Sequence, residues 1–256
     1  MPAFSSVFKD SRPFLPKTDG VNYIPKMPQN QTQKVIIVLG PTASGKSDLG
    51  IFLAQKISAK GGPASGWQGA EIISADSRQV YRGMDIGTGK VSKKEQRLAK
   101  HHLIDVVDPK KVFTVSDFKK LGQKTINDLR RHYKLPIIVG GAGFYIDALV
   151  RNFDVPEVPP NRKLRAELAK QSAEQLFSKL LALDPRRAKT IDPKNKVRLI
   201  RALEIIEAKG KVPLLNTKYE KLSTQYKVLW LGLKPKNLEK RIKLRLEKRL
   251  TSGMVK

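Results

Sequence analysis

No cysteine occurs among the 256 residues of the chain. This absence excludes disulfides, thiolate metal sites and cysteine nucleophiles together. The sequence also lacks an apolar run of 18 residues and the apolar core of a secretory signal, so we expect no membrane partner and a cytoplasmic location. Histidine is scarce, and the adjacent pair His101 and His102 has no Cys, His or acidic partner at metal-ligand spacing. We interpret this pair as structural or close to RNA.

Acidic side chains are few relative to basic ones. The formal net charge of +27 and the pI near 10.3 predict a polyanionic partner such as nucleic acid. Residues 151–256 carry 27 of the 50 Lys and Arg but only 11 of the 23 Asp and Glu. Solvated helix faces would also explain this bias, but we favour a polyanion-binding surface in this part of the chain.

What the sequence does contain is a phosphate-loop pattern. Val35 to Leu39 (V-I-I-V-L) predict a buried strand, and Gly40 to Ser47 match G-x-x-x-x-G-K-[ST], followed by helical spacing from Asp48 to Ser58. In such a unit the loop N–H groups face an anion, Lys46 reaches phosphate oxygens and Ser47 ligates Mg²⁺. We predict a diphosphate or triphosphate site made by Gly40, Thr42, Ala43, Ser44, Gly45, Lys46 and Ser47.

A second predicted strand, residues 71–74, leads to Asp76. In doubly wound sheets ligands bind beyond the carboxyl ends of the strands, so Asp76 should face the same crevice as the phosphate loop. Three roles for Asp76 stay open at this point: a general base, which we favour, a Mg²⁺ ligand, or a helix cap with Gln79 as its partner.

Two glycine-containing segments follow. Residues 82–90 form a polar loop in which Thr88 and Lys90 either add phosphate contacts or are merely loop residues. A helix over 116–133 and a strand over 135–139 precede the second glycine segment, 140–143. This segment is either a tight strand-to-helix turn or a place where substrate approaches the backbone.

From Arg162 the pattern changes to charged helices, expected over 163–170, 173–183 and 196–208. Arg198 and Arg201 should share a helix face suited to phosphate contact. A strand over 226–233 and a basic helix over 237–250 complete the pattern. At the other end, residues 1–33 contain five prolines and no periodic apolar pattern, which predicts a disordered tail.

An ordered set of segments resembles the tRNA dimethylallyltransferase family, also called tRNA isopentenyltransferase. The segments are G-P-T-A-S-G-K-S, D-S-R-Q-V-Y-R-G-M-D-I-G-T-G-K, H-H-L-I-D-V-V-D-P, V-G-G-A-G-F-Y and R-L-I-R-A-L-E, between about residues 34 and 254. The resemblance implies an α/β fold, with a P-loop NTPase-like parallel sheet flanked by helices and interrupted by a helical insertion. The expected parts are a tail over 1–33, a core over 34–159, a tRNA-binding insertion over 160–223 and a return to the core over 224–256.

The resemblance also implies a reaction. The family transfers a dimethylallyl group from dimethylallyl diphosphate to N6 of the adenosine adjacent (3′) to the anticodon, in tRNAs that read codons starting with U. Asp76 matches the catalytic aspartate and would be the general base, while the loop and a Mg²⁺ on Ser47 would hold the diphosphate. The anticodon stem-loop would be bound by a monomer through Asp76, Ser77, Arg78, Gln79, Ala142, Val197, Arg198, Leu199, Ile200 and Arg201.

The chain departs from the family pattern at a few places. Ala142 stands where the family usually has threonine, and Lys196 stands where an acidic or polar residue is common. Losing the threonine hydroxyl removes a possible hydrogen bond to substrate. Family members usually continue for several dozen residues beyond Gly253 and Met254, so we expect this chain to lack their C-terminal helices.

Three other functions compete with this interpretation. A P-loop kinase of a nucleotide or small metabolite has little need of a +27 charge. An isopentenyltransferase acting on free adenine nucleotides would not need a basic helical insertion. A non-catalytic RNA-binding module would leave the phosphate loop and Asp76 without a purpose.

Overall fold

A computed structural model describes residues 33–61, 66–151, 155–213 and 226–255. The predicted tail, apart from Gln33, and the last residues of the predicted insertion lie outside these ranges. Within them, no helix is both long and apolar enough to cross a membrane.

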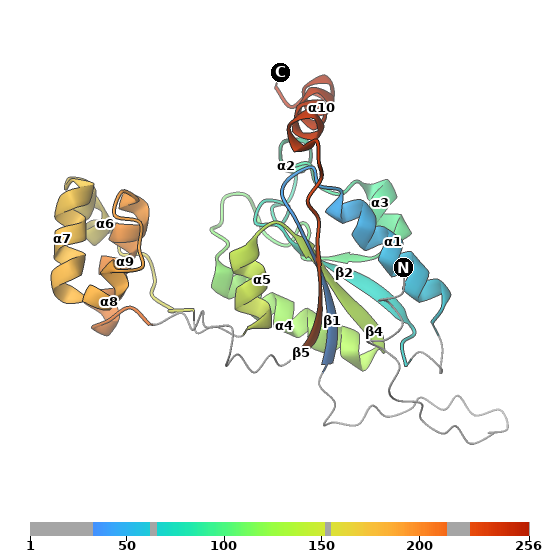
Figure 1. The fold of residues 1–256 in the computed structure, drawn as a ribbon, viewed down its shortest axis with the longest axis horizontal. Helices are drawn as coiled ribbons and strands as arrows, with labels where there is room; N and C mark the ends of the chain where they lie inside the picture. The colour runs from blue at the N-terminus through green and yellow to red at the C-terminus, as the bar shows by residue number, and fades with distance from the viewer. Residues whose placement is uncertain (1–32, 62–65, 152–154, 214–225, 256) are drawn as a thin grey trace. The chain divides into compact units, whose positions relative to one another are not determined.

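The described residues form one five-stranded parallel sheet, in the order β3-β2-β4-β1-β5 (Figure 1). The strands are Gln33–Leu39 (β1), Gly69–Ala75 (β2), His101–His102 (β3), Lys134–Gly140 (β4) and Tyr226–Gly232 (β5). Strand β1 lies between β4 and β5, with Ile37 paired to Ile138 on one side and to Trp230 on the other. The carboxyl ends of β1, β2 and β4 therefore meet at one edge of the sheet.

The described part of the chain also contains ten helices. They are Lys46–Ala59 (α1), Asp85–Thr88 (α2), Lys93–Leu98 (α3), Val115–Arg131 (α4), Gly143–Val150 (α5), Arg162–Ala169 (α6), Ala173–Leu183 (α7), Pro185–Ala188 (α8), Lys196–Lys209 (α9) and Leu238–Thr251 (α10). The long strands and helices fall where the sequence pattern predicts them. The short helices α2, α3 and α8 were not predicted, because four to six residues carry too little periodicity.

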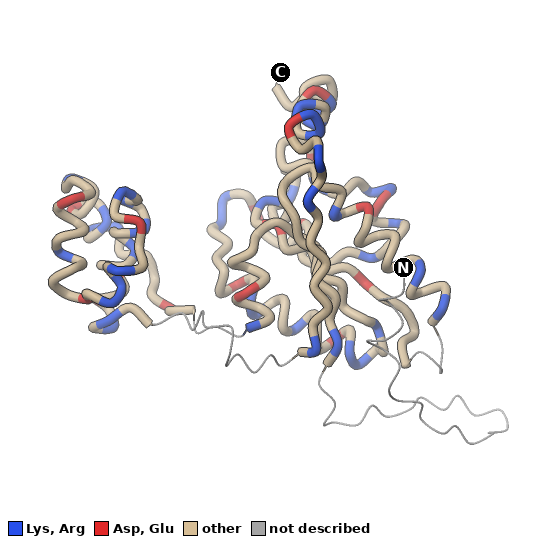
Figure 2. The backbone as a smooth tube through the Cα atoms, viewed as in Figure 1, with Lys and Arg blue, Asp and Glu red and all other residues tan. Residues whose placement is uncertain are grey.

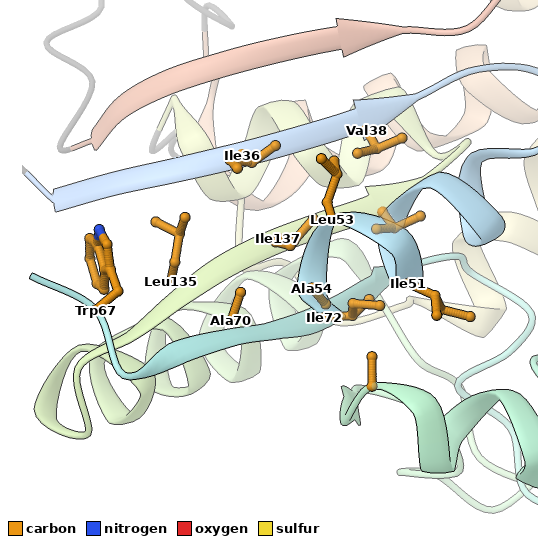
Figure 3. Close-up of a cluster of buried hydrophobic side chains, with 12 residues drawn as sticks. Ile36, Val38, Ile51, Leu53, Ala54, Trp67, Ala70, Ile72, Leu135 and Ile137 are labelled. Carbon is orange, nitrogen blue, oxygen red and sulfur yellow. The ribbon is translucent and has the colours of Figure 1, made fainter. Parts of the chain in front are cut away.

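The sheet is apolar because its strands alternate buried side chains between two covered faces. On one face, Ile36, Ile72 and Ile137 pack with Leu53 and Ala54 of helix α1 (Figure 3). Ile37, Ile73 and Ile138 are fully buried and point to the opposite face. This packing fixes the position of α1, and with it the loop that precedes α1.

The chain divides into two compact units. The first comprises residues 1–111, 122–143 and 225–256 and contains the sheet, and the second comprises residues 112–121 and 144–224. The second unit therefore includes helices α6 to α9 of the predicted insertion, together with residues on either side of it.

Helices α6 to α9 have a core of their own. Leu176, Leu180 and Leu199 are fully buried, and Ser172 begins α7 with a capping box to Gln175. Glu204 is 2% exposed and accepts two hydrogen bonds of 2.7 Å from Arg165, one to each carboxylate oxygen. This ion pair joins α6 to α9 in the middle of the unit.

Helix α10 follows β5 and is different in kind, because none of its residues is buried. Its apolar residues at four-residue steps remain largely exposed, including Leu246 and Leu250 at 45% and 46%. Figure 2 shows basic residues repeated along this helix. Arginines of this helix make hydrogen bonds to the phosphate loop and to the 87–89 loop, and these contacts are part of the site.

Candidate functional site

The phosphate loop joins β1 to α1. Gly45, the N-cap residue of α1, has a φ of +90° and makes no side-chain cap, so the first N–H groups of the helix stay available. Free N–H groups at a helix N-terminus attract anions. At Gly40, a Cβ would lie 2.7 Å from Ser44 Oγ and 2.9 Å from the Leu233 carbonyl oxygen, so this position needs glycine. The loop has the open backbone that a phosphate cradle requires.

Lys46 lies over this loop. Its Nζ donates to the Pro41 carbonyl oxygen at 2.9 Å. Burial lowers the pKa of Lys46, and the charge of Arg245 lowers it further, while Asp76 acts in the opposite direction. Lys46 therefore lies close to a second cation, Arg245. An anion bound between them would reduce their mutual repulsion.

Asp76 follows β2 and lies at the same edge of the sheet. It lines a small inner cavity of about 20 Å³ together with Lys46, Ser47 and Gln79. The predicted convergence of Asp76 with the phosphate loop is therefore present in the structure. The convergence does not by itself decide among the roles left open for Asp76.

The hydrogen bonds of Asp76 distinguish its two carboxylate oxygens. Oδ1 accepts from the backbone N–H of Arg78 at 2.8 Å and of Gln79 at 3.4 Å. Within the described ranges, the partner of Oδ2 is the side-chain amide of Gln79, at 3.5 Å. Residues 77–80 form turns and no α-helix begins there, so Asp76 organises a turn and does not cap a helix.

The glycine turn after β4 lies against this end of β2. A Cβ at Gly140 would collide with the Ala75 carbonyl group, and the N–H of Ala142 donates to that same Ala75 oxygen at 3.3 Å. A Cβ at Gly141 would be 3.9 Å from Lys46 Nζ. Gly140 therefore allows close packing against the end of β2, and the segment forms the turn between β4 and α5. The alternative that substrate approaches this backbone stays a prediction.

A larger cleft, of about 280 Å³, opens on the outer side of the phosphate loop. One wall is the loop and the start of α1, a second is formed by Gly89, Lys90 and Val91, and a third by Arg241 and Arg245 of α10. Arg241 Nε donates to the Ala43 carbonyl oxygen at 2.8 Å. The lining includes four cationic side chains, of Lys46, Lys90, Arg241 and Arg245, and two carboxylates, of Asp48 and Glu95. Because Lys90 is paired with Asp85 and Asp105, the cations left to hold a diphosphate are Lys46, Arg241 and Arg245.

Arg241 and Arg245 were not predicted as site residues from the sequence. Arg245 Nη1 lies 3.4 Å from Thr42 Oγ1, and its Nη2 donates to the Gly89 carbonyl oxygen at 3.0 Å. The available signal was the recurrence of arginine at four-residue steps, 241, 245 and 249, which puts the three side chains on one helix face. Nothing in that spacing indicates which part of the chain the face contacts.

Lys90 has a structural role in the cleft wall. Its Nζ donates to the Tyr81 carbonyl oxygen at 2.7 Å and to Asp85 Oδ1 at 2.6 Å, and it also pairs with Asp105. Burial alone would lower the pKa of Lys90, but the hydrogen bonds and charges of Asp105 and Asp85 outweigh burial and raise it. Lys90 thus holds the 85–90 loop from the side of β3.

The predicted RNA-contact segment on α9 is divided between exposed and buried positions. Val197 is 79% exposed and Arg198 is exposed, whereas Leu199 is fully buried in the helical core. Arg201 pairs with Glu204 and donates to the Val158 carbonyl oxygen at 3.0 Å. Only Val197 and Arg198 present free side chains, and the tRNA contact of the whole segment stays a prediction.

The histidine pair is held by local contacts, and His101 also lines the inner cavity beside Asp76. His102 Nε2 lies 2.7 Å from Glu71 Oε2 across neighbouring strands, and His101 Nδ1 lies 2.7 Å from the Ala99 carbonyl oxygen. Burial lowers the pKa of His101. No group of three or more His, Cys, Asp or Glu able to hold a metal occurs among the described residues.

Comparisons with known proteins match most of the chain. The family model described as IPP transferase matches residues 79–256. A tRNA dimethylallyltransferase of Bifidobacterium longum subsp. infantis is 40% identical over 229 residues, which cover 88% of this chain and 67% of that protein. One of Anoxybacillus flavithermus is 36% identical over 225 residues, covering 87% of this chain and 69% of that protein.

Solved structures give the same result. A tRNA isopentenylpyrophosphate transferase from Staphylococcus epidermidis is 34% identical with a TM-score of 0.55, covering 86% of this chain and 70% of that one. A eukaryotic dimethylallyltransferase, described as acting on tRNA, is 31% identical with a TM-score of 0.68 over 86% of this chain and 54% of that one.

Proposed function

Because the chain belongs to the IPP transferase family of tRNA dimethylallyltransferases, we propose that it carries out this transfer on tRNA. The proposed reaction moves a dimethylallyl group from dimethylallyl diphosphate to N6 of the adenosine adjacent (3′) to the anticodon, in tRNAs that read codons starting with U. The proposed site of action is the cytoplasm, with one chain acting on one anticodon stem-loop. A single observation carries the proposal: Asp76, Lys46 and Ser47 line one cavity at the carboxyl edge of the sheet.

The leaving group would be held by the cation-lined cleft. As the bond between the prenyl carbon and the bridging oxygen breaks, negative charge develops on the diphosphate. The loop N–H groups, Lys46, Arg241 and Arg245 are arranged to absorb that charge. Positive groups fixed before reaction stabilise the transition state without having to reorganise.

The amine would lose its proton to Asp76. The N6 lone pair forms the new C–N bond while the diphosphate departs, and the N6 proton passes to a base. Because Oδ1 is held by the Arg78 and Gln79 amides, Oδ2 is the oxygen available to accept it. Ser77, Arg78 and Gln79 on the same turn, and Ala142 at the neighbouring turn, are the proposed contacts to the target nucleotide.

Mg²⁺ fits this donor set. Ser47 supplies a hydroxyl beside the phosphate cradle, and Mg²⁺ commonly uses one or two protein oxygens plus phosphates and water. When bound, the ion would neutralise diphosphate charge. Ser47 would be its protein ligand, and Asp76 would stay free for the proton.

The decisive experiment incubates the full chain with unmodified tRNA and either dimethylallyl diphosphate or ATP, followed by nucleoside mass analysis. Prenylated adenosine formed only with dimethylallyl diphosphate supports the proposal. Phosphoryl transfer from ATP would contradict the proposal and would identify a kinase instead. A third arm, with AMP in place of tRNA, identifies an enzyme that acts on free nucleotides.

A further inference from the structure

Arg249 is the third arginine on this face of α10, and it has no role in lining the cleft. Arg241 and Arg245 line the cleft, but Arg249 does not. Its Nη1 lies 3.4 Å from the carbonyl oxygen of Gly87. Arg245 contacts the carbonyl oxygen of Gly89 in the same loop. Two neighbouring guanidinium groups on one helix thus reach two carbonyl groups of the same short loop.

This loop is held from two sides. Helix α2, Asp85–Thr88, has no buried residue and no side-chain cap at its start. On one side Lys90 ties it to Asp105, and on the other side lie the α10 arginines. Helix α10 likewise has no residue in its span that is fully buried. The hydrogen bonds that join the described loop to α10 run from the guanidinium groups of Arg245 and Arg249 to the backbone carbonyls of Gly89 and Gly87.

The loop is shaped to receive these side chains. Gly89 has a φ of +58°, a conformation that glycine adopts without strain. A Cβ at this position would collide with Nη2 of Arg249 and with Nη2 of Arg245. The missing side chain therefore gives both guanidinium groups access to the backbone of the cleft wall.

The position of Arg249 carries an electrostatic cost. Burial lowers the pKa of Arg249, and the charge of Arg245 lowers it further, with only Asp76 acting the other way. Its Nε is buried without a hydrogen-bond partner, and none of the ion pairs among the described residues includes it. Burial and the neighbouring charge of Arg245 both disfavour a guanidinium at this place. Its contacts with the loop therefore indicate its role.

We propose that Arg249 is a positioning residue: its guanidinium clamps the Gly87–Gly89 backbone to α10 and so fixes the cleft wall that faces the phosphate loop. It has no contact with the reacting atoms in this role. The inference deepens the proposed transfer reaction and rests on it, because the wall that Arg249 fixes belongs to the diphosphate cleft.

The direct test is hydrogen exchange of the loop. The amides of Gly89 and Lys90 donate to the Ile86 and Asp85 carbonyl oxygens, each at 3.0 Å, so their exchange reports loop opening. In R249Q we expect these two amides to exchange about tenfold faster, since weakening a hydrogen bond by about 1.4 kcal/mol corresponds to that factor. R249K, which keeps the charge but not the planar fork, should lie between R249Q and the original chain.

The matched control is K248Q, which removes one charge from the adjacent, exposed position of the same helix. Exchange in β1 serves as an internal reference for intact folding. Equal exchange of the 85–90 amides in R249Q and K248Q would overturn the clamp.

The transfer assay gives a second readout. R249Q should raise the KM for dimethylallyl diphosphate several-fold, with partial rescue by R249K and none of this change in K248Q. An unchanged KM in R249Q would refute the link between the clamp and the cleft. If the unaltered chain transfers no prenyl group, the proposed function fails, whereas the exchange experiment still decides the clamp.

Discussion

At the scale of single residues, Asp76 offers a clean separation of binding from chemistry. D76N retains an oxygen that can accept from the Arg78 amide, so the turn should persist, but it cannot take a proton. We expect the rate of transfer to fall by about 10² to 10⁴, with tRNA affinity nearly unchanged. Single-turnover transfer and filter binding measure the two quantities.

The control for this variant is D108N. Asp108 Oδ1 accepts from the Lys110 amide at 2.8 Å, which is the same kind of turn at a position that lines neither cavity. D108N should leave the rate intact. A proportional loss of rate and affinity in D76N would contradict the assignment of Asp76 as base.

Site residues could be predicted from the sequence where neighbouring positions of the chain determine their geometry. The loop from Gly40 to Ser47 and the carboxylate of Asp76 were both found from spacing, because a strand, a loop and a helix in succession dictate their geometry. Leu199 shows the limit. It lies within a segment expected to touch tRNA, yet its side chain is buried, since one helix turn presents residues to both core and solvent.

At the scale of elements, α10 determines how strongly the cleft should hold diphosphate. Arg245 is shared between Thr42 and Gly89 and lines the cleft. R245Q should weaken pyrophosphate binding by about 10- to 100-fold, because a hydrogen bond to a charged group contributes roughly 1.5–3 kcal/mol. Titration calorimetry with inorganic pyrophosphate measures this directly.

For comparison, K243Q changes an exposed lysine of the same helix that does not line the cleft. It should bind pyrophosphate as the original chain does. Equal weakening in K243Q and R245Q would mean that the helix acts only through its net charge.

The link between α6 and α9 makes the helical unit sensitive to acid. Burial alone would raise the pKa of Glu204, but hydrogen bonds from Arg165, Arg201 and the Asn161 amide lower it to about 2 from an ordinary 4.5. A carboxylate with a depressed pKa contributes stability that is complete above pH 4.5 and is lost as the pH falls toward 2. Urea unfolding followed by circular dichroism should show this loss.

In E204Q the loss between these pH values should shrink, because the titrating group is gone. E207Q, at an exposed position of the same helix, should keep it. A pH dependence that is the same in E204Q and the original chain would exclude Glu204 as its source.

The elements themselves were largely readable from the sequence, since buried β-branched strands and amphipathic helices follow their two periodicities. The contacts between these elements could not be predicted from the sequence. The hydrogen bond between Arg245 and Thr42 spans 203 residues, and only the parallel pairing of β5 with β1 brings those positions together. Local patterns carry no information about such pairings.

At the scale of the whole molecule, the excess of positive charge should control RNA affinity. If six to ten phosphate groups are contacted, affinity should fall by about 10³ to 10⁵ between 50 and 200 mM salt. Binding of an unmodified anticodon stem-loop across this range measures the effect. A flat response would favour the small-molecule substrates instead.

The pairing of β5 beside β1 has a consequence for synthesis. A ribosome makes the phosphate loop early, but the arginines that close the cleft come some 200 residues later, on the helix that follows β5. A nascent chain therefore carries an unfinished cradle throughout most of its translation. Under the proposed function, tight binding of the diphosphate should begin only once β5 has docked beside β1, so a growing polypeptide should not sequester the proposed prenyl donor.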